Sequence, residues 1–294
     1  MKPIHVGALV LLGAIWGASF LFIRVAVHDF GPMPLMFMRV TLGGLVLLAY
    51  ATFLRQTPDL GSRWRKFLIM GSLNAAIPFV LIAWSELTIN ASLAAIINSM
   101  TPLFTAVIAA FLGNEDLTWQ KVSGVMLGII GVSVLVGGSP MELNQEVIVA
   151  VLASVVAALF YGIGANYASR HFTGKHPLHT SIGQLLGASL ILLIPAGATI
   201  PSATPSTAAI IAMLALVLVS TTFAYMLYFF LLNNVGPTRT VSVTFLVPVF
   251  GTIWGIIFLD ETFNMSMLLG MAIILTSVGL VIGTRYRKAK VVEA

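Results

Sequence analysis

Two segments, one in each half of the chain, decide the fold. They read ASLAAIINSMTPLFTAVIAAFLGNED at residues 91–116 and PTRTVSVTFLVPVFGTIWGIIFLDET at residues 237–262. Each contains an apolar run of about 20 residues, which as a helix is long enough to cross about 30 Å of hydrocarbon. A shift of 146 residues superimposes them without a gap, and the identical pairs then include Pro102 with Pro248, Phe104 with Phe250, and Glu115 with Glu261. A proline within the run and an acidic residue after it recur, so the chain is predicted to contain an internal repeat.

The composition of the whole chain agrees with a membrane protein. Of its 294 residues, 59% are hydrophobic and 9% are charged, and the mean hydropathy is +1.02. A soluble domain has about 25% charged residues and could not cover its surface with so few. The net charge of +5 could suggest nucleic acid, but the basic residues lie between apolar runs, where they orient a membrane protein. Cysteine is absent, which excludes disulfides and thiolate metal sites.

Ten apolar runs are long enough to span a bilayer as helices. β-spans are excluded, because the runs are continuous and about twice as long as barrel strands. The sequence therefore predicts an all-α polytopic membrane protein. The predicted spans are His5–Val27, Pro34–Leu54, Lys66–Trp84, Ala91–Leu112, Thr118–Val136, Glu146–Ala168, Leu178–Ala196, Thr207–Leu232, Thr238–Leu259 and Asn264–Thr284.

Lysine and arginine counts predict the orientation. With the N-terminus inside, 13 of the 15 basic residues fall on the inner side, and the other two, Arg24 and Arg39, lie near the outer ends of their spans. Because cytoplasmic loops carry an excess of Lys and Arg, both termini are predicted to be cytoplasmic. The inner set is Lys2, Arg55, Arg63, Arg65, Lys66, Lys121, Arg170, Lys175, Arg239, Arg285, Arg287, Lys288 and Lys290.

The repeat divides the chain into two five-span halves. Residues 1–137 form the first repeat, 138–145 an outer linker, 146–284 the second repeat and 285–294 a basic cytoplasmic tail. Five is odd, so the two halves are predicted to be inverted relative to each other, with the substrate site near the midplane between them. The alternative is that any two hydrophobic halves look alike. A shift of 145 also pairs Ala14–Gly17 with Leu159–Gly162, and Arg39 with Gln184.

Several motifs resemble the EamA branch of the drug/metabolite transporter superfamily. They are Ala14–Phe20, Pro34 with Arg39, Ser92–Ile97 leading to Thr101–Phe104, Gly113–Glu115, and in the second half Pro248 with Asp260–Glu261. The resemblance covers residues 5–284. It implies a ten-helix basket of two inverted five-helix bundles, around a central cavity lined mainly by spans 1, 3, 4, 6, 8 and 9. Within that branch, the aromatic-rich cavity positions resemble YddG-like amino-acid exporters.

Polar and aromatic side chains inside the spans are the candidates for a substrate cavity. Polar groups in lipid need partners, so they face the bundle, where the alternative role is helix–helix hydrogen bonding. As a set, neutral polar groups among aromatic faces suit a neutral or zwitterionic substrate with an apolar side chain. The candidates are Trp16, Asn74, Phe79, Trp84, Asn98, Ser99, Thr101, Tyr161, Asn166, Gln184, Tyr225, Tyr228 and Thr244.

Two prolines and two charges complete the candidate residues. Pro102 and Pro248 lie within spans, where a proline removes a backbone hydrogen bond, so they are either packing kinks or hinges for alternating access. Arg39 is an interfacial anchor, or is paired with Asp29 or Glu86, or is a docking cation for substrate carboxylate in an outer vestibule. Glu86, close to the end of its span, is the other candidate for a charge in that outer vestibule. The spans that the resemblance assigns to the cavity carry no acid away from their ends.

Chemistry beyond transport finds little support. Gly174-Lys175-His176 is not a Walker loop, and no HExxH or GxSxG motif occurs. His171, His176 and His179 share one loop without an acid or cysteine, so no metal and no cofactor is expected.

The expected function is export of small neutral metabolites, most of all hydrophobic or aromatic amino acids, by alternating access without ATP. The alternatives are a drug exporter or a nucleotide-sugar-like exchanger of the same superfamily, and, from another class, a membrane enzyme or lipid-handling protein. The expected partners are a small-molecule substrate and the lipid bilayer, with no nucleic acid, and the chain is expected to be a monomer or weak dimer in the inner (plasma) membrane.

Overall fold

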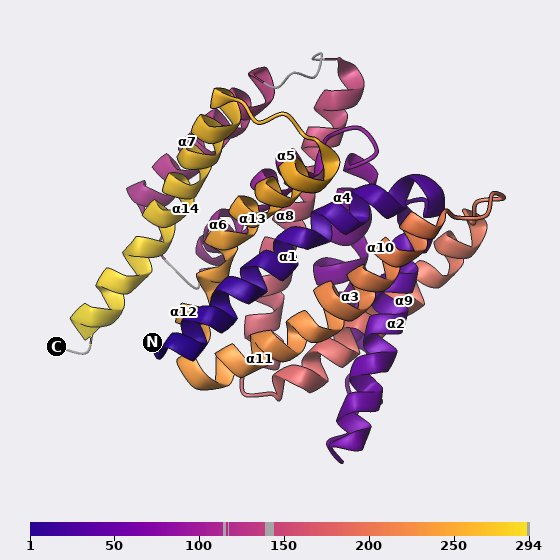
Figure 1. Ribbon diagram of the computed structural model, residues 1–294. Coiled ribbons are helices and arrows are strands. Elements are labelled where there is room, and N and C mark those ends of the chain that lie inside the picture. The colour runs from indigo at the N-terminus through magenta and orange to yellow at the C-terminus, as the bar shows by residue number, and fades with distance from the viewer. Residues whose placement is uncertain (114–115, 117, 139–143, 293–294) are drawn as a thin grey trace.

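The computed structural model is a bundle of helices (Figure 1). It describes residues 1–113, 116, 118–138 and 144–292, and over this part of the chain it contains no strand. Six of the ten predicted spans are single helices. They are α1 (Pro3–Phe30), α2 (Pro32–Phe53), α7 (Trp119–Gly137), α8 (Gln145–Phe172), α9 (Pro177–Ala198) and α14 (Met265–Val292).

The other four spans are divided into shorter helices, two of them with a π-helical centre. The third span is α3 (Trp64–Gly71), η1 (Ser72–Ala76) and α4 (Ile77–Ser85), and the eighth is α10 (Thr207–Val217), η2 (Leu218–Phe223) and α11 (Ala224–Val235). The fourth is α5 (Ala91–Asn98) and α6 (Thr101–Phe111), and the ninth is α12 (Pro237–Val241) and α13 (Val243–Leu259).

Nine of these spans are long and apolar enough to cross a membrane, counted over the described residues. In the tenth, Met265–Val281 of α14 is a shorter apolar stretch. The all-α, ten-span prediction is therefore confirmed. Helix α14 continues to Val292, so the predicted tail from residue 285 begins as helix rather than as free chain.

Short connections keep neighbouring spans adjacent. Gly31 alone separates α1 from α2, with φ 73°, a conformation that glycine adopts without the steric penalty of a Cβ. Gly236, with φ 81°, does the same between α11 and α12. Side-chain oxygens of Asn90, Asn144 and Ser206 accept hydrogen bonds from the first turns of α5, α8 and α10, which defines where these helices begin.

The two halves pack through matching contacts. Helix α1 packs against α13 of the second half, and α8 packs against α6 of the first half. A Cβ on Gly17 would lie 2.7 Å from the Gly251 nitrogen, and a Cβ on Gly162, its repeat equivalent, would lie 2.9 Å from the Thr105 nitrogen. Both crossings therefore depend on a glycine that lets two backbones approach closely. The repeated sequence has become a repeated interface.

The π-helical segments occupy equivalent places in the two repeats. Segment η1 begins at Ser72 and η2 at Leu218, which are 146 residues apart, the shift that superimposes the repeat. In η2 the hydroxyls of Thr221 and Thr222 donate to the carbonyls five residues earlier, of Leu216 and Val217, at 2.9 and 3.0 Å. A π segment widens a helix and is frequent at functional sites. The third span of each repeat, which is the third or the eighth span of the chain, thus has a π-helical segment near its centre.

The predicted hinge prolines lie in different settings. Pro102 is in the first turn of α6, directly after a break at Ser99 and Met100, where a proline is tolerated. Pro248 is inside α13, which runs without a break from Val243 to Leu259. The first half therefore has a broken helix at its proline and the second half has a continuous one.

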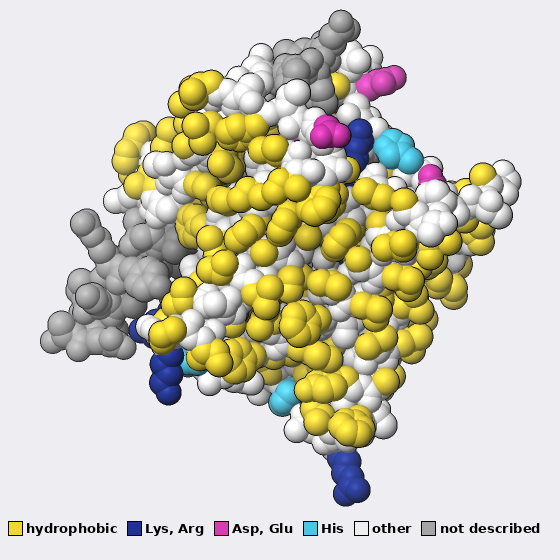
Figure 2. Space-filling model, viewed as in Figure 1, with side chains coloured by type: hydrophobic (Ala, Val, Ile, Leu, Met, Phe, Trp, Pro, Cys, Tyr) yellow, Lys and Arg dark blue, Asp and Glu magenta, His cyan; other side chains and the backbone are white. Residues whose placement is uncertain are grey.

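The surface separates apolar and charged side chains (Figure 2). A broad apolar band covers the visible face, dark-blue Lys and Arg side chains project mainly along one edge, and Asp and Glu lie near the opposite edge. Such a band suits the hydrocarbon of a bilayer. Below, "predicted inner" and "predicted outer" name the two faces by the orientation that the sequence predicts.

Candidate substrate site

A buried arginine lies at the meeting point of the two halves. Arg39, on α2, is 7% exposed. Its Nε donates a hydrogen bond to Thr221 Oγ1 of η2 at 3.1 Å, and its guanidinium carbon lies 3.9 Å from the centre of the Phe79 ring on α4. We call Arg39, Phe79 and Thr221 the Arg39 cluster. Because Thr221 itself donates to the Leu216 carbonyl, its oxygen is held in place to accept from the guanidinium.

The Arg39 charge lacks a direct counter-ion. Neither of the expected pairs forms, because no ion pair links Arg39 to Asp29 or Glu86 within the described chain, although Glu86 acts on it electrostatically. A charge inside the membrane is costly and marks a functional site by default. The ring face of Phe79 attracts the cation, but a ring carries no formal negative charge. The arrangement is therefore suited to receive an anionic group.

An uncharged cluster holds the equivalent position in the second half. Gln184, on α9, donates from Nε2 to the Tyr225 hydroxyl at 2.8 Å, and its Oε1 accepts from Asn74 Nδ2 of η1 at 3.5 Å. We call Gln184, Tyr225 and Asn74 the Gln184 cluster. Each second-helix side chain thus contacts the aromatic residue of its own repeat and the π segment of the other repeat.

Aromatic rings surround the two clusters. The Phe79 and Tyr161 rings are 6.3 Å apart between centroids, which brings α8 against the Arg39 cluster. On the other side, Trp16 lies 5.7 Å from Tyr228, and Phe229 lies 5.9 Å from Tyr225. The structure therefore places seven of the predicted cavity residues in two groups: Phe79 and Tyr161 beside Arg39, and Asn74, Gln184, Tyr225, Tyr228 and Trp16, which are linked through the Phe229 ring.

Five of the other candidates hydrogen-bond locally or border a helix break. The hydroxyls of Ser99, Thr101 and Thr244 donate to the Ile96, Asn98 and Val241 carbonyls of their own spans. Asn166 Nδ2 donates to the Thr105 and Gly162 carbonyls, at 2.9 Å each, and so joins α8 to α6. Asn98 Oδ1 is buried at the α5–α6 break, without a hydrogen bond from the described residues.

Trp84 lies apart from both clusters. It is 41% exposed and lines a hollow of about 710 Å³ at the predicted outer face. The rest of that hollow is formed by Thr88 and, at the beginning of α8, by Asn144, Gln145, Glu146 and Val149.

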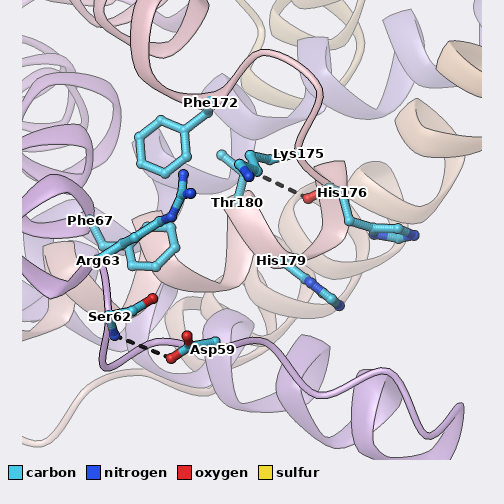
Figure 3. Close-up of a pocket in the computed structure, with 9 residues that line it drawn as sticks. All are labelled: Asp59, Ser62, Arg63, Phe67, Phe172, Lys175, His176, His179 and Thr180. Atoms are coloured by element: carbon cyan, nitrogen blue, oxygen red, sulfur yellow. Dashed lines mark hydrogen bonds between the residues drawn. The ribbon is translucent and has the colours of Figure 1, made fainter.

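A second hollow, of about 280 Å³, lies at the predicted inner face between the α2–α3 loop and the start of α9 (Figure 3). Arg63, Lys175, His176 and His179 line it together with Asp59. Burial lowers the pKa of the His176 imidazole, and His179 beside it lowers that pKa further. Hydrogen bonding from Ser62, by its side chain first and then by its backbone N at 3.2 Å, holds the pKa of Asp59 below its usual range. Within the described chain, no group of three or more His, Asp or Glu could hold a metal ion.

The sequence analysis missed several partners of these clusters. Thr221 was absent from the candidates, although Ser220-Thr221-Thr222 places three hydroxyl residues in the middle of a span. Thr41 and Ser189 were missed too, and their hydroxyl oxygens lie 2.6 Å apart and join α2 to α9. Runs of hydroxyl residues at mid-span were the signal that could have found Thr221.

Comparison with known proteins agrees with this architecture. The model of the EamA-like transporter family matches residues 4–137 and 148–283. "Uncharacterized transporter YoaV" of Bacillus subtilis is 23% identical over 88% of this chain and 90% of its own length. "Uncharacterized inner membrane transporter YedA" of Escherichia coli K12 is 26% identical over 95% and 91%.

Two further comparisons concern function and fold. A protein of Escherichia coli K12 named "Probable amino-acid metabolite efflux pump" is 28% identical over 96% of this chain and 97% of its own. One crystal structure, at 19% identity, matches 95% of this chain and 97% of that chain with a TM-score of 0.67, which shows a shared fold. Since the family model matches both halves, this chain belongs to the EamA-like transporter family.

Proposed function

We propose that this transporter exports small zwitterionic metabolites, most of all amino acids with apolar or aromatic side chains. The observation that carries the proposal is Arg39, a buried cation that lies on an aromatic ring between the two repeats and has no direct counter-ion among the residues that the structure describes. A substrate carboxylate would supply that counter-ion through charge-assisted hydrogen bonds. The rings of Phe79 and Tyr161 would then face the substrate side chain.

The neutral partners around Arg39 favour a zwitterion over a multiply charged anion. Tyr161, Tyr225 and Gln184 offer hydroxyl and amide groups but no second positive charge. A nucleotide sugar or sugar phosphate carries at least two negative charges and would call for more than one cation. The efflux-pump relative adds support from its name alone, at 28% identity.

Transport is proposed to proceed by alternating access of one site, without ATP and between inverted repeats in the inner membrane. The matching glycine crossings and the equivalent π segments support two related halves that move against each other. The YedA relative is named as an inner membrane transporter. The helix break just before Pro102 and the kink expected at Pro248 would be the points at which the two spans bend.

Transport in proteoliposomes tests the substrate. Vesicles containing the purified protein are preloaded with leucine or phenylalanine, and exchange of labelled amino acid is measured against a panel of competitors. Apolar and aromatic amino acids should compete well, whereas amino alcohols, which lack the carboxylate, and sugar phosphates should compete poorly. Preferred exchange of phosphorylated compounds, or equal competition by amino acids and amino alcohols, would contradict the proposal.

Single-cysteine labelling tests the proposed orientation, since the chain has no cysteine of its own. A cysteine at Asp59 or Gly174 should be protected from an impermeant maleimide in intact cells, while one at Gly138 or Thr204 should react. The reverse pattern would place the termini outside.

A further inference from the structure

The turn between α4 and α5 is held from one side by α1. Nη1 of Arg24 donates to the backbone carbonyl oxygen of Glu86, and to that of Ile89 at 3.4 Å. We call residues 86–92 the outer latch, because they join the third and fourth spans at the predicted outer face. Arg24 therefore ties the first span to the latch through backbone atoms rather than through an ion pair.

The other side of the latch is held by the end of α13. The Glu261 carboxylate accepts hydrogen bonds from Ala91 N at 2.7 Å, from Ser92 N at 3.0 Å and from the Ser92 hydroxyl. These N–H groups belong to the first turn of α5, which has no partner for them within the helix. The latch thus joins the first, third, fourth and ninth spans, four of those expected to line the path of the substrate.

The latch also contains a buried carboxyl group, that of Glu86, which takes part in none of these hydrogen bonds. The Glu86 side chain is 0% exposed, and within the described chain neither of its carboxyl oxygens has a hydrogen-bond partner. Three charged groups act on it: Arg24 from α1, Arg39 from α2 and Glu261 from the segment after α13. Arg24 donates its hydrogen bonds to backbone carbonyls, and the Glu261 carboxylate accepts its hydrogen bonds from the first turn of α5.

An ionised carboxylate in such a place would be strongly destabilising. Burial of a charge without hydrogen bonds or a paired partner favours the neutral form of the group. When the latch is closed, Glu86 is therefore more stable as the carboxylic acid. When the latch opens, water reaches the group, and the carboxylate becomes the stable form beside Arg24.

We propose that Glu86 is a proton-binding site of the outer latch, and that protonation from the external solution favours the closed latch. On closing, one Glu86 oxygen takes a proton from external water, and on opening it returns that proton to the same side. No proton crosses the membrane in this cycle, so external pH controls the gate without driving accumulation. The inference rests on the proposed transport function and orientation.

Accessibility of a buried latch residue tests this without any substrate. Ile89 is 0% exposed in the latch, so Ile89→Cys should react with an impermeant maleimide only when the latch opens. The labelling rate is divided by that of an exposed Thr204→Cys, which corrects for the effect of pH on thiol reactivity. As external pH falls from 8 to 5, the corrected rate should drop, by up to about tenfold per pH unit for one linked proton.

Glu86→Gln should remove this dependence, because the amide mimics the protonated acid at every pH. Its corrected labelling should stay at the low-pH value, and Glu86→Met should behave in the same way if the amide perturbs the fold. Glu146→Gln is the matched control, an exposed acid at the same face, and should retain the full pH response. The proposal would be overturned if the corrected labelling rate of Ile89→Cys did not change with external pH. It would also be overturned if that pH dependence remained in both Glu86 variants.

Exchange in proteoliposomes separates this proposal from the substrate proposal. With internal pH fixed, exchange of phenylalanine should slow as external pH falls, and Glu86→Gln should make it independent of external pH. If labelling responds to pH while no amino acid is exchanged, the substrate proposal fails and the proton site stands. If exchange occurs but neither labelling nor exchange responds to pH, the proton site fails.

Discussion

The Arg39 cluster and the Gln184 cluster occupy equivalent places in two repeats, yet one carries a charge and the other does not. Both have a second-helix side chain against the aromatic residue of their own repeat, Phe79 or Tyr225, and against the π segment of the other repeat. In the Gln184 cluster, neutral donors and acceptors satisfy one another. The two repeats therefore share a symmetric frame of helices, whereas the residue at the second-helix position, arginine in one half and glutamine in the other, decides which cluster is charged.

The largest effect is expected when the two clusters are made alike. Arg39→Gln should lower exchange of leucine or phenylalanine by about 100-fold, because hydrogen bonds to a charged group contribute up to about 3 kcal/mol. Exchange of the matching amino alcohol should change far less, since it has no carboxylate for Arg39 to bind. An equal loss of exchange for the amino acid and the amino alcohol would show that Arg39 does not bind the carboxylate.

A control for folding accompanies that variant. Removal of a buried charge that lacks a counter-ion should leave thermal stability in detergent unchanged or raised. Melting at a much lower temperature would mean that the lost exchange reflects unfolding rather than lost binding.

The next largest effect concerns the hydroxyl that holds Arg39. Thr221→Val keeps the shape of the side chain but removes the acceptor of the buried guanidinium, and should destabilise the protein by about 1–3 kcal/mol. Thr221→Ser should retain most of the stability. In the Arg39→Gln background Thr221→Val should cost less, because the charge that needs the acceptor is gone. An equal cost in both backgrounds, measured by denaturant titration, would separate Thr221 from Arg39.

A smaller effect is expected in the uncharged cluster. Tyr225→Phe removes the acceptor of Gln184 Nε2, a neutral hydrogen bond that contributes about 0.5–1.5 kcal/mol. Exchange should therefore fall by about threefold to tenfold, well below the effect at Arg39. A loss as large as that of Arg39→Gln would mean that the neutral cluster, and not the charged one, anchors the substrate.

The smallest effect belongs to a charge that water already solvates. Asp59, at the predicted inner face, is exposed, and hydrogen bonding from the Ser62 side chain and from Ser62 N lowers its pKa. A lowered pKa stabilises the folded loop above the ordinary Asp pKa of about 3.9, and this contribution disappears as the pH falls through the lowered value. Asp59→Asn should leave amino-acid exchange at pH 7 unchanged. At low pH, the rates of backbone amide hydrogen exchange in the loop should become the same in the variant and in the unaltered protein. A marked loss of exchange at pH 7 would give this exposed loop a role in the path of the substrate.

Much of the fold could be predicted from the sequence. Apolar runs of about 20 residues are sufficient to predict membrane helices. In lipid, a single segment can satisfy all its backbone hydrogen bonds only as a helix, because strands need a closed barrel. The repeat shift of 146 residues, read from matching prolines and acidic residues, also predicted where equivalent features would lie. It anticipated neither π segment, since a π segment depends on how a helix packs against its neighbours.

For the site, the residue types were predictable but their groupings were not. Tyr161, Gln184 and Tyr225 were identified because polar and aromatic side chains in a span must face protein. Trp84 met the same criterion but lies exposed at the predicted outer end. Position along a span does not give the direction of a side chain around it, so the criterion could not separate the two cases.

Hydropathy and periodicity are local properties of the chain, and they were enough to predict about ten membrane crossings in two related halves. The burial of Arg39 beside Thr221, 182 residues away, and the lack of an ion pair between Arg39 and either Asp29 or Glu86 within the described chain, became apparent only in the folded bundle. The same holds for the Glu86 carboxyl, which is buried in the latch without a hydrogen-bond partner among the described residues. Contacts between distant spans depend on how each helix is rotated in the packed bundle, and that rotation is settled only when all the helices come together.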